Sequence, residues 1–261
     1  WQQASEAIRI CIERSGVDPS QILGVGCSGH GNGLYLLDKQ NLPLLGIQSL
    51  DSRAVETVDE FAADGRDDLI YDICLQKPWP SQTATLLAWL KRHAPDIYAQ
   101  TGTAFLCKDY LRFCLTGTIG SDYSDMSGCG LLRLPSLEYD QELLTHYGLE
   151  DCPTLLPPLS QSTDIIGKVT PEAAEQTGLQ AGTPMVAGLF DIVASALGAG
   201  TTQPGQASIV AGTWSINQVV VEQPVSDPSI FMAAAISPDR FVEAEASATS
   251  ATNLAWMVRE F

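Results

Sequence analysis

The stretch TPMVAGLFDIVASALGAG, residues 183–200, joins an apolar run to a run of small and apolar residues through a single acidic residue, Asp191. The run up to Phe190 has the character of a buried strand, and the pattern from Ile192 to Leu197 is helical. Asp191 is therefore expected at the carboxyl end of a strand and beside a helix N-terminus. Open α/β sheets bind their ligands at this place.

Two roles are open for Asp191 from its position. As an N-cap, its carboxylate would accept hydrogen bonds from free backbone N–H groups, which stabilises a helix by about 1 kcal/mol. As a catalytic group, it would be a carboxylate whose basicity no basic neighbour in the sequence reduces.

Expected strands and helices alternate along the rest of the chain, and this alternation predicts the α/β class. Apolar spacing predicts helices, one of which ends at Gly117 and another of which begins at Thr170 as N-cap with Pro171 in its first position. The expected helices are 4–14, 52–63, 82–93, 108–117 and 170–179, with a further one led by SATSATNLAW, and the expected strands are 22–29, 33–38, 183–190 and a pair within 207–221.

The segment after Leu134 differs from the rest of the chain in its amino-acid composition. It is rich in proline and acidic residues, and Pro157 and Pro158 are incompatible with a regular helix or a central strand. We expect a surface excursion there.

Composition limits the function classes. The chain has 261 residues, of which 45% are hydrophobic and 17% charged, so it can form one or two domains with a substantial core. The formal charge of −17 argues against nucleic-acid partners, which require clustered lysine and arginine. No apolar run reaches the roughly 18 residues of a membrane span, and the amphipathic first residues do not form a targeting signal. We therefore expect a soluble protein without a membrane partner.

Cysteine and histidine usage points away from disulfides and zinc. The 7 cysteines are scattered singly, and their odd number suits a reducing cytoplasm. The 3 histidines lie far apart in the sequence, which gives little support to a structural zinc site.

The stretch ASIVAGTWSINQVVV, residues 207–221, reads as two strands joined by a Gly-Thr-Trp-Ser turn. Backbone amides in such a turn, with the hydroxyl of Thr213 beside Gly212, can receive phosphate oxygens. The same sequence also suits an ordinary hairpin turn.

Several blocks in order resemble the FGGY family of carbohydrate kinases, and the wording of GLFD and GTWSIN is similar to its L-xylulose kinase branch. The resemblance covers nearly the whole chain. Its blocks are SGHGNGLYLLD (28–38), LDSRA (50–54), LLAWLKRHAPD (86–96), KDYLRFCLTG (108–117), GTPMVAGLFD (182–191) and AGTWSIN (211–217).

The resemblance implies an incomplete actin-like ATPase fold, related to ribonuclease H, with two domains. Residues 1–200 would form the N-terminal sugar-binding domain, without the first hairpin and its Asp-x-Gly turn. Residues 201–261 would begin a truncated C-terminal ATP-binding domain. A chain of this extent alone is expected to lack catalytic activity.

The implied activity is transfer of the ATP γ-phosphoryl group to a hydroxyl of a small ketose, with Mg²⁺ bridging the nucleotide phosphates. Asp191 matches the catalytic aspartate, which would bind the sugar, accept the proton of its hydroxyl and lie at the metal. Gly212 and Thr213 would contact phosphates. L-xylulose is the first expected substrate, while other pentuloses, 3-keto-L-gulonate and erythritol stay open, as does a homodimer. The alternative is a sugar-binding or regulatory protein without catalysis on the same fold.

The resemblance also suggests sugar contacts. His30, between Gly29 and Gly31, matches a position where pentulose kinases of the family contact the sugar, and its imidazole can donate to and accept from hydroxyls. Asp51 and Arg53 match an acidic-x-Arg block, although the aromatic residue usual there is replaced by Ser49 or Leu50. This pair either binds hydroxyls and holds the cleft wall or is a helix cap beside an exposed arginine. Further candidates for the cleft are Trp79, Lys108, Asp109 and Asp125. Trp79 could instead cover a loop, and the three charged residues could instead be solvated at the surface.

Overall fold

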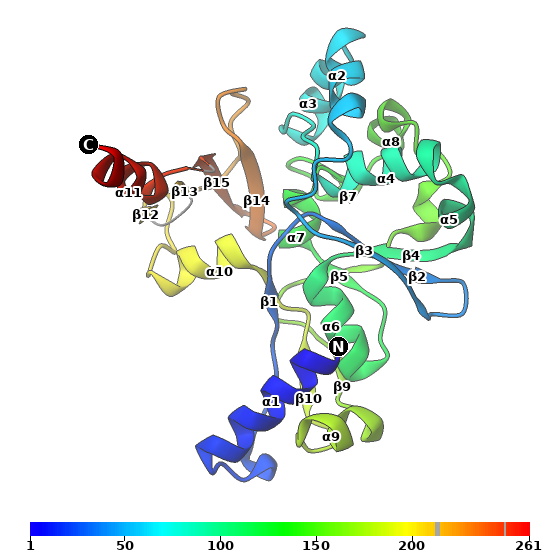
Figure 1. Cartoon of the computed structure of the whole chain (residues 1–261), viewed down its shortest axis with the longest axis vertical. Coiled ribbons are helices and arrows are strands. Elements are labelled where there is room, and N and C mark those ends of the chain that lie inside the picture. Colours follow the sequence, from blue (N-terminus) through cyan, green and yellow to red (C-terminus); the bar gives the residue numbers. More distant parts are fainter. Residues whose placement is uncertain (212–214, 248) are drawn as a thin grey trace.

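A computed structural model describes residues 1–211, 215–247 and 249–261 and has the α/β character expected from the sequence (Figure 1). The α-helices are α1 (Gln2–Ser15), α2 (Val55–Ala63), α3 (Arg66–Cys74), α4 (Thr83–His93), α5 (Pro95–Gln100), α6 (Cys107–Thr116), α7 (Tyr123–Gly128), α8 (Gln141–Tyr147), α9 (Pro171–Thr177), α10 (Asp191–Gly198) and α11 (Ala251–Glu260).

Short strands lie between these helices in the sequence and pair to form several small sheets. They are β1 (Ser28–Gly29), β2 (Leu34–Asp38), β3 (Pro43–Ile47), β4 (Thr101–Phe105), β5 (Ser121–Asp122), β6 (Leu132–Arg133), β7 (Glu138–Tyr139), β8 (Leu159–Ser160), β9 (Ile165–Lys168), β10 (Pro184–Val186), β11 (Leu189–Phe190), β12 (Ala207–Ala211), β13 (Ser215–Val221), β14 (Met232–Ser237) and β15 (Arg240–Ser247).

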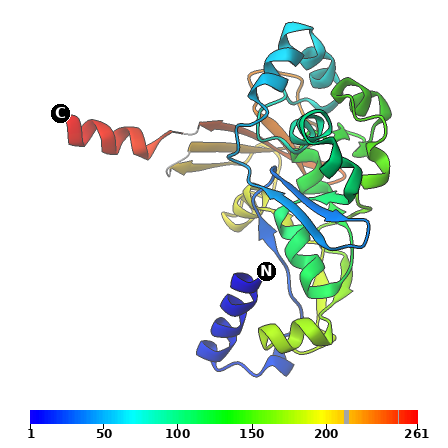
Figure 2. The same cartoon turned by 45° about the vertical axis from the view of Figure 1, so that its right-hand side comes forward.

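The largest core surrounds an antiparallel sheet of strand order β3-β2-β4. Strand β2 lies in its middle and contacts α4 and α6, and its Leu34, Leu36 and Leu37 are buried in this core. A second core forms where α10 packs on the sheet β12-β13-β15-β14. This C-terminal sheet and α11 extend from one side of the body in Figure 2.

Helices α1 and α9 lie side by side at the end of the molecule that holds the N-terminus (Figure 1). Thr170 caps α9 by accepting a hydrogen bond from the N–H of Ala173, and Gly117 ends α6 in the left-handed region, as the sequence predicts. Among the described residues, no helix has the length and apolarity needed to cross a membrane.

Three expectations from the sequence need correction. The single strand expected over 183–190 is divided into β10 and β11, which belong to different sheets. The strand expected over 22–29 is reduced to β1 and a bridge between Val25 and Met185. The segment after Leu134 is more than a surface excursion, because it contains α8, whose Leu143 and Tyr147 are buried in the main core. The Asp140 carboxylate begins this helix by accepting a hydrogen bond from the N–H of Leu143.

Candidate active site

Two parallel strands bring distant residues together at the site. Strand β1 pairs with β11 in the register Ser28 to Leu189 and Gly29 to Phe190. The residues that follow, His30 and Asp191, therefore leave neighbouring strand ends. This arrangement is the one expected for a ligand site at the carboxyl ends of parallel strands.

A cavity of about 430 Å³ opens at these strand ends. Its walls come from the loops after β1 and β3, from the start of α10 and from the inner face of the C-terminal sheet. The volume falls in the range typical of small-molecule sites. The lining residues are His30, Gly31, Asn32, Gln48, Ser49, Leu50, Trp79, Phe190, Asp191, Ile192, Ile216, Phe231, Met232, Ala244 and Ala246.

Asp191 occupies the first position of α10 and is exposed to this cavity. Phe190 holds the N-cap position, so Asp191 is not the N-cap residue of this helix. Desolvation by the cavity walls raises the pKa of its carboxyl above the ordinary 3.8, although the N–H of Ile192 and the nearby His30 act in the opposite direction. A carboxylate with a raised pKa is a better proton acceptor than an ordinary aspartate.

His30 is half-buried, and both of its ring nitrogens have neighbours. Nε2 lies 3.2 Å from the hydroxyl of Tyr35, and Nδ1 lies 3.3 Å from the carbonyl oxygen of Gly31. The pKa of His30 is raised, chiefly by hydrogen bonding with the Cys107 side chain, while desolvation lowers it and Asp191 contributes a smaller increase. The imidazole is therefore held in a fixed orientation at the wall of the cavity.

Gly31 is a glycine because the backbone passes close to an aromatic ring. A Cβ at this position would lie 2.5 Å from Cε2 of Phe190, far inside van der Waals contact. This close approach fits the loop after β1 against the residue that precedes Asp191.

Asp51 and Arg53 form a bidentate pair, with Nε–Oδ1 and Nη2–Oδ2 distances of 2.8 Å. The Arg53 guanidinium also lies 5.2 Å from the centre of the Trp89 ring. Neither residue is among those that line the cavity, whereas Ser49 and Leu50, just before them, are. The structure therefore brings His30, Gly31 and Asp191 together and leaves Asp51 and Arg53 beside the cavity.

Two polar groups of the cavity wall were not assigned to the sugar from the sequence. Asn32 is 2% exposed, has a φ of 62°, and its Oδ1 has no hydrogen-bond partner among the described residues. Trp79, expected only as a cleft candidate, packs its ring on Phe231, and its Nε1 also has no partner within 1–211, 215–247 and 249–261. A buried polar atom without a partner is costly, so each is suited to a polar ligand. The signal for Asn32 was its place between two glycines in GNG, a context that suits a left-handed residue.

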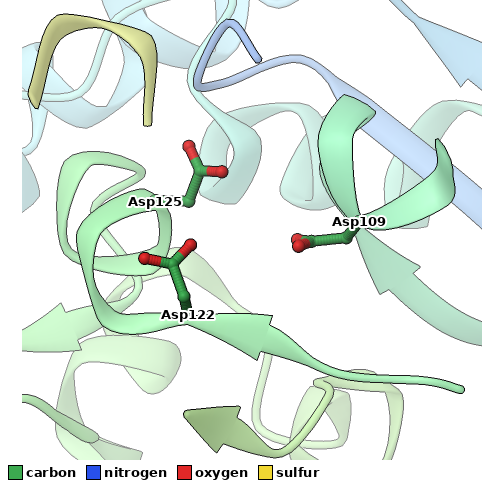
Figure 3. Close-up of side chains that lie close together, drawn as sticks. All are labelled: Asp109, Asp122 and Asp125. Carbon is green, nitrogen blue, oxygen red and sulfur yellow. The ribbon is translucent and has the colours of Figure 1, made fainter. Parts of the chain in front are cut away.

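The remaining cleft candidates lie elsewhere. Lys108, Asp109 and Asp125 are fully buried, so they are neither cavity residues nor solvated surface residues. The carboxylates of Asp109, Asp122 and Asp125 face a common centre (Figure 3). Nζ of Lys108 lies 2.6, 2.6 and 3.0 Å from their oxygens, so an ammonium group already occupies that centre.

The turn with Gly212 and Thr213 falls outside the described residues. The strands on either side of it, β12 and β13, pair antiparallel with Ala211 opposite Ser215, so the two expected strands are present.

The family model for the N-terminal domain of the FGGY family of carbohydrate kinases matches residues 1–198. The chain belongs to the FGGY family. The resemblance found in the sequence blocks is thereby confirmed.

The similarity to individual FGGY kinases extends over the whole chain. The chain is 40% identical to a probable L-xylulose kinase of Pasteurella multocida, and the match covers 100% of this chain and 55% of that protein. It is 38% identical to the L-xylulose/3-keto-L-gulonate kinase of Escherichia coli over 100% of this chain and 53% of that protein. The chain spans about half the length of the curated relatives it matches.

Solved FGGY kinases share the fold. The crystal structure of a xyloylose kinase from Brucella ovis superposes with a TM-score of 0.83 at 30% identity, over 96% of this chain and 51% of that one. The expected actin-like ATPase architecture is therefore confirmed, with about half of the related chain represented.

Proposed function

We propose that this chain contributes the sugar-binding part of an ATP-dependent kinase for a small ketose. The observation that carries the proposal is the Asp191 carboxylate, which faces the cavity beside His30 with a raised pKa. A sugar hydroxyl is a weak nucleophile near neutral pH. A carboxylate within hydrogen-bond reach orients that hydroxyl and accepts its proton as the γ-phosphoryl group is transferred.

In this proposal the residues of the cavity wall have different roles. Asp191 accepts the proton, and His30, the Gly31 backbone and the unpartnered atoms of Asn32 and Trp79 bind sugar hydroxyls. The Asp51–Arg53 pair, next to the wall residues Ser49 and Leu50, supports this side of the site.

Residues 1–200 would form the sugar domain and residues 201–261 the start of the nucleotide domain. The apolar side chains of Ile216, Ala244 and Ala246, which close the cavity from the C-terminal sheet, are consistent with this division. Gly212 and Thr213 would contact the nucleotide phosphates. We place the reaction in the cytoplasm, where the singly scattered cysteines suit a reducing environment.

Mg²⁺ would accompany the nucleotide. Carboxylate oxygen is a ligand type that Mg²⁺ prefers, and Asp191 offers one in the cavity with no salt bridge from a lysine or arginine of the described chain. When bound, the ion neutralises the charge that develops on the phosphates.

L-xylulose is the substrate we expect first, because two similar proteins are named for it. The name of the Escherichia coli relative makes 3-keto-L-gulonate the second candidate. Both are small polyhydroxy ketones of a size that the cavity can hold.

The test is ADP release by the complete gene product with Mg-ATP and a panel of pentuloses, hexulosonates and tetritols, with sugar binding followed by calorimetry. We expect strong release with one sugar and little with the others. Sugar binding without release from a folded, complete protein would overturn the kinase and leave a sugar-binding protein.

A further inference from the structure

The strand that leads to Asp191 is held by hydrogen bonds from buried polar groups. Arg112 Nη1 donates to the carbonyl of Ala187 at 2.8 Å, and the N–H of Leu189 donates to the carbonyl of Cys27 at 3.2 Å. The N–H of Phe190, one residue before Asp191, donates to the hydroxyl of Ser124 at 2.9 Å. This last bond ties the N-cap position of α10 to helix α7.

The hydroxyl of Ser124 is oriented by a charged partner. It donates its proton to Oδ2 of Asp122, which also accepts from the N–H of Ser124 at 2.8 Å and from the hydroxyl of Ser162 at 3.0 Å. Because the proton is directed at a carboxylate, a lone pair of the hydroxyl is left for the N–H of Phe190. Ser124 is 1% exposed, so water does not compete for these bonds.

Asp122 belongs to a buried ion cluster, which fixes its carboxylate. Figure 3 shows the three acids of this cluster, Asp109, Asp122 and Asp125. Its cations are Lys108 and Arg112. Nζ of Lys108 lies 2.6 Å from the second carboxylate oxygen of Asp122. The same lysine packs under the two strands of the site, since a Cβ on Gly29 would lie 3.0 Å from its Cβ and one on Gly188 would lie 3.4 Å from its Cδ. The ion cluster therefore packs against the backbone of both segments that lead to the site.

We propose that Ser124 is a positioning residue for Asp191: its hydroxyl, oriented by Asp122, fixes the backbone of Phe190 and thereby the place of the carboxylate in the cavity. This inference rests on the proposed function, in which Asp191 accepts the proton of the sugar. Ser124 is not among the residues that line the cavity, so it acts through the chain.

The chain offers a matched control on the same helix. The hydroxyl of Ser127, also buried in α7, accepts a hydrogen bond of 2.8 Å from the N–H of Ala235 in β14. Ser124→Ala and Ser127→Ala therefore each remove a serine hydroxyl that holds the backbone N–H of a strand. Only the first strand leads directly to Asp191.

The experiment measures kcat, KM for the sugar and Tm for both variants in the complete gene product. We expect similar losses of Tm, but a fall in kcat of about tenfold or more for Ser124→Ala alone, with KM for the sugar within about threefold of the parent, because small misplacements of a reacting group are costly. Ser124→Cys keeps the size of the side chain with a weaker acceptor, and its kcat should lie between those of the parent and Ser124→Ala. It also serves if the alanine variant does not fold.

Unchanged kcat in the Ser124 variants, or equal losses in the Ser127 variant, would overturn the positioning role. The outcome is separable from a failure of the proposed function. If Asp191→Asn abolishes activity while the Ser124 variants retain it, only the positioning role is wrong. If the parent itself shows no sugar-dependent ADP release, the kinase proposal is wrong.

Discussion

Gly29 and Phe190 face each other across the parallel pair β1–β11, so the residues that follow them, His30 and Asp191, enter the same cavity. More than 150 residues of sequence separate the two. The pairing therefore brings two residues that are distant in the sequence together at the site.

The activity should depend on the protonation of Asp191. Desolvation raises the pKa of this carboxyl above 3.8, and only its unprotonated form can accept a proton. We expect kcat to fall as the pH decreases through this raised pKa, which a pH profile of kcat measures. A profile that stays level down to pH 3.8, measured while Tm shows the protein to be folded, would contradict the assignment.

Trp79 should contribute a hydrogen-bond donor to the sugar. Trp79→Phe keeps an aromatic ring against Phe231 but removes the unpartnered Nε1–H. We expect KM for the sugar to rise about three- to tenfold, the usual value of one hydrogen bond, with little change in kcat. Trp79→Ala also loses the packing and should raise KM further. Equal KM values for the parent and Trp79→Phe would show that the N–H does not contact the sugar.

Gly31 should not tolerate a side chain. The added methyl of Gly31→Ala would lie 2.5 Å from the ring of Phe190, and overpacking of this kind costs about 1–3 kcal/mol. We expect a lower free energy of unfolding and weaker sugar binding, measured by denaturation and calorimetry. Gly198→Ala is the control, since a Cβ there meets nothing within 4 Å and alanine suits a helix. Wild-type sugar affinity in Gly31→Ala would contradict the close fit of this loop.

The buried ion cluster should respond differently to the loss of two of its acids. Burial raises the pKa of Asp125 well above 3.8, although Lys108 acts against this, so folding favours the form of its carboxyl that carries a proton. With that proton, the charges of Lys108 and Arg112 balance those of Asp109 and Asp122.

Asp125→Asn keeps this balance, whereas Asp122→Asn removes a charge paired with Lys108 at 2.6 Å. We expect a cost of about 3–5 kcal/mol for Asp122→Asn, the usual result of breaking a buried ion pair, and a clearly smaller one for Asp125→Asn. Urea denaturation at neutral pH measures both. The reverse order would show that the ionised form of Asp125 is the one that the fold requires.

The stability of the parent should also depend on this proton. Because the folded pKa of Asp125 is raised, its contribution is complete below the unfolded pKa and is lost as the pH rises through the folded value. Asp125→Asn should remove that part of the pH dependence, which denaturation curves at several pH values would reveal.

Local signals made part of the fold predictable. Thr170 before Pro171 marked the start of α9, and Gly117 marked the end of α6, because caps depend on neighbours in the sequence. Asp191 was predictable for the same reason, as an acidic residue between a strand and a helix.

Features that depend on distant contacts were not predictable. Lys108 could be read as a surface residue because two of its three carboxylate partners, Asp122 and Asp125, lie on other elements of the chain. Trp79 lines the cavity together with Phe231, a distant residue just before β14 that packs on its ring. The polar atoms of Asn32 are buried by the fold as a whole, and the sequence alone does not show which of them lacks a partner.

The most direct test of the central claim compares the complete gene product with its Asp191→Asn variant in sugar-dependent ADP release, with sugar binding measured on both. If Asp191 is the proton acceptor, kcat falls by about 10²–10⁴-fold while the sugar still binds, since the amide cannot take up the proton. A variant that binds the sugar and keeps kcat within about tenfold of the parent would contradict the account, because the loss would fall below what a general base contributes.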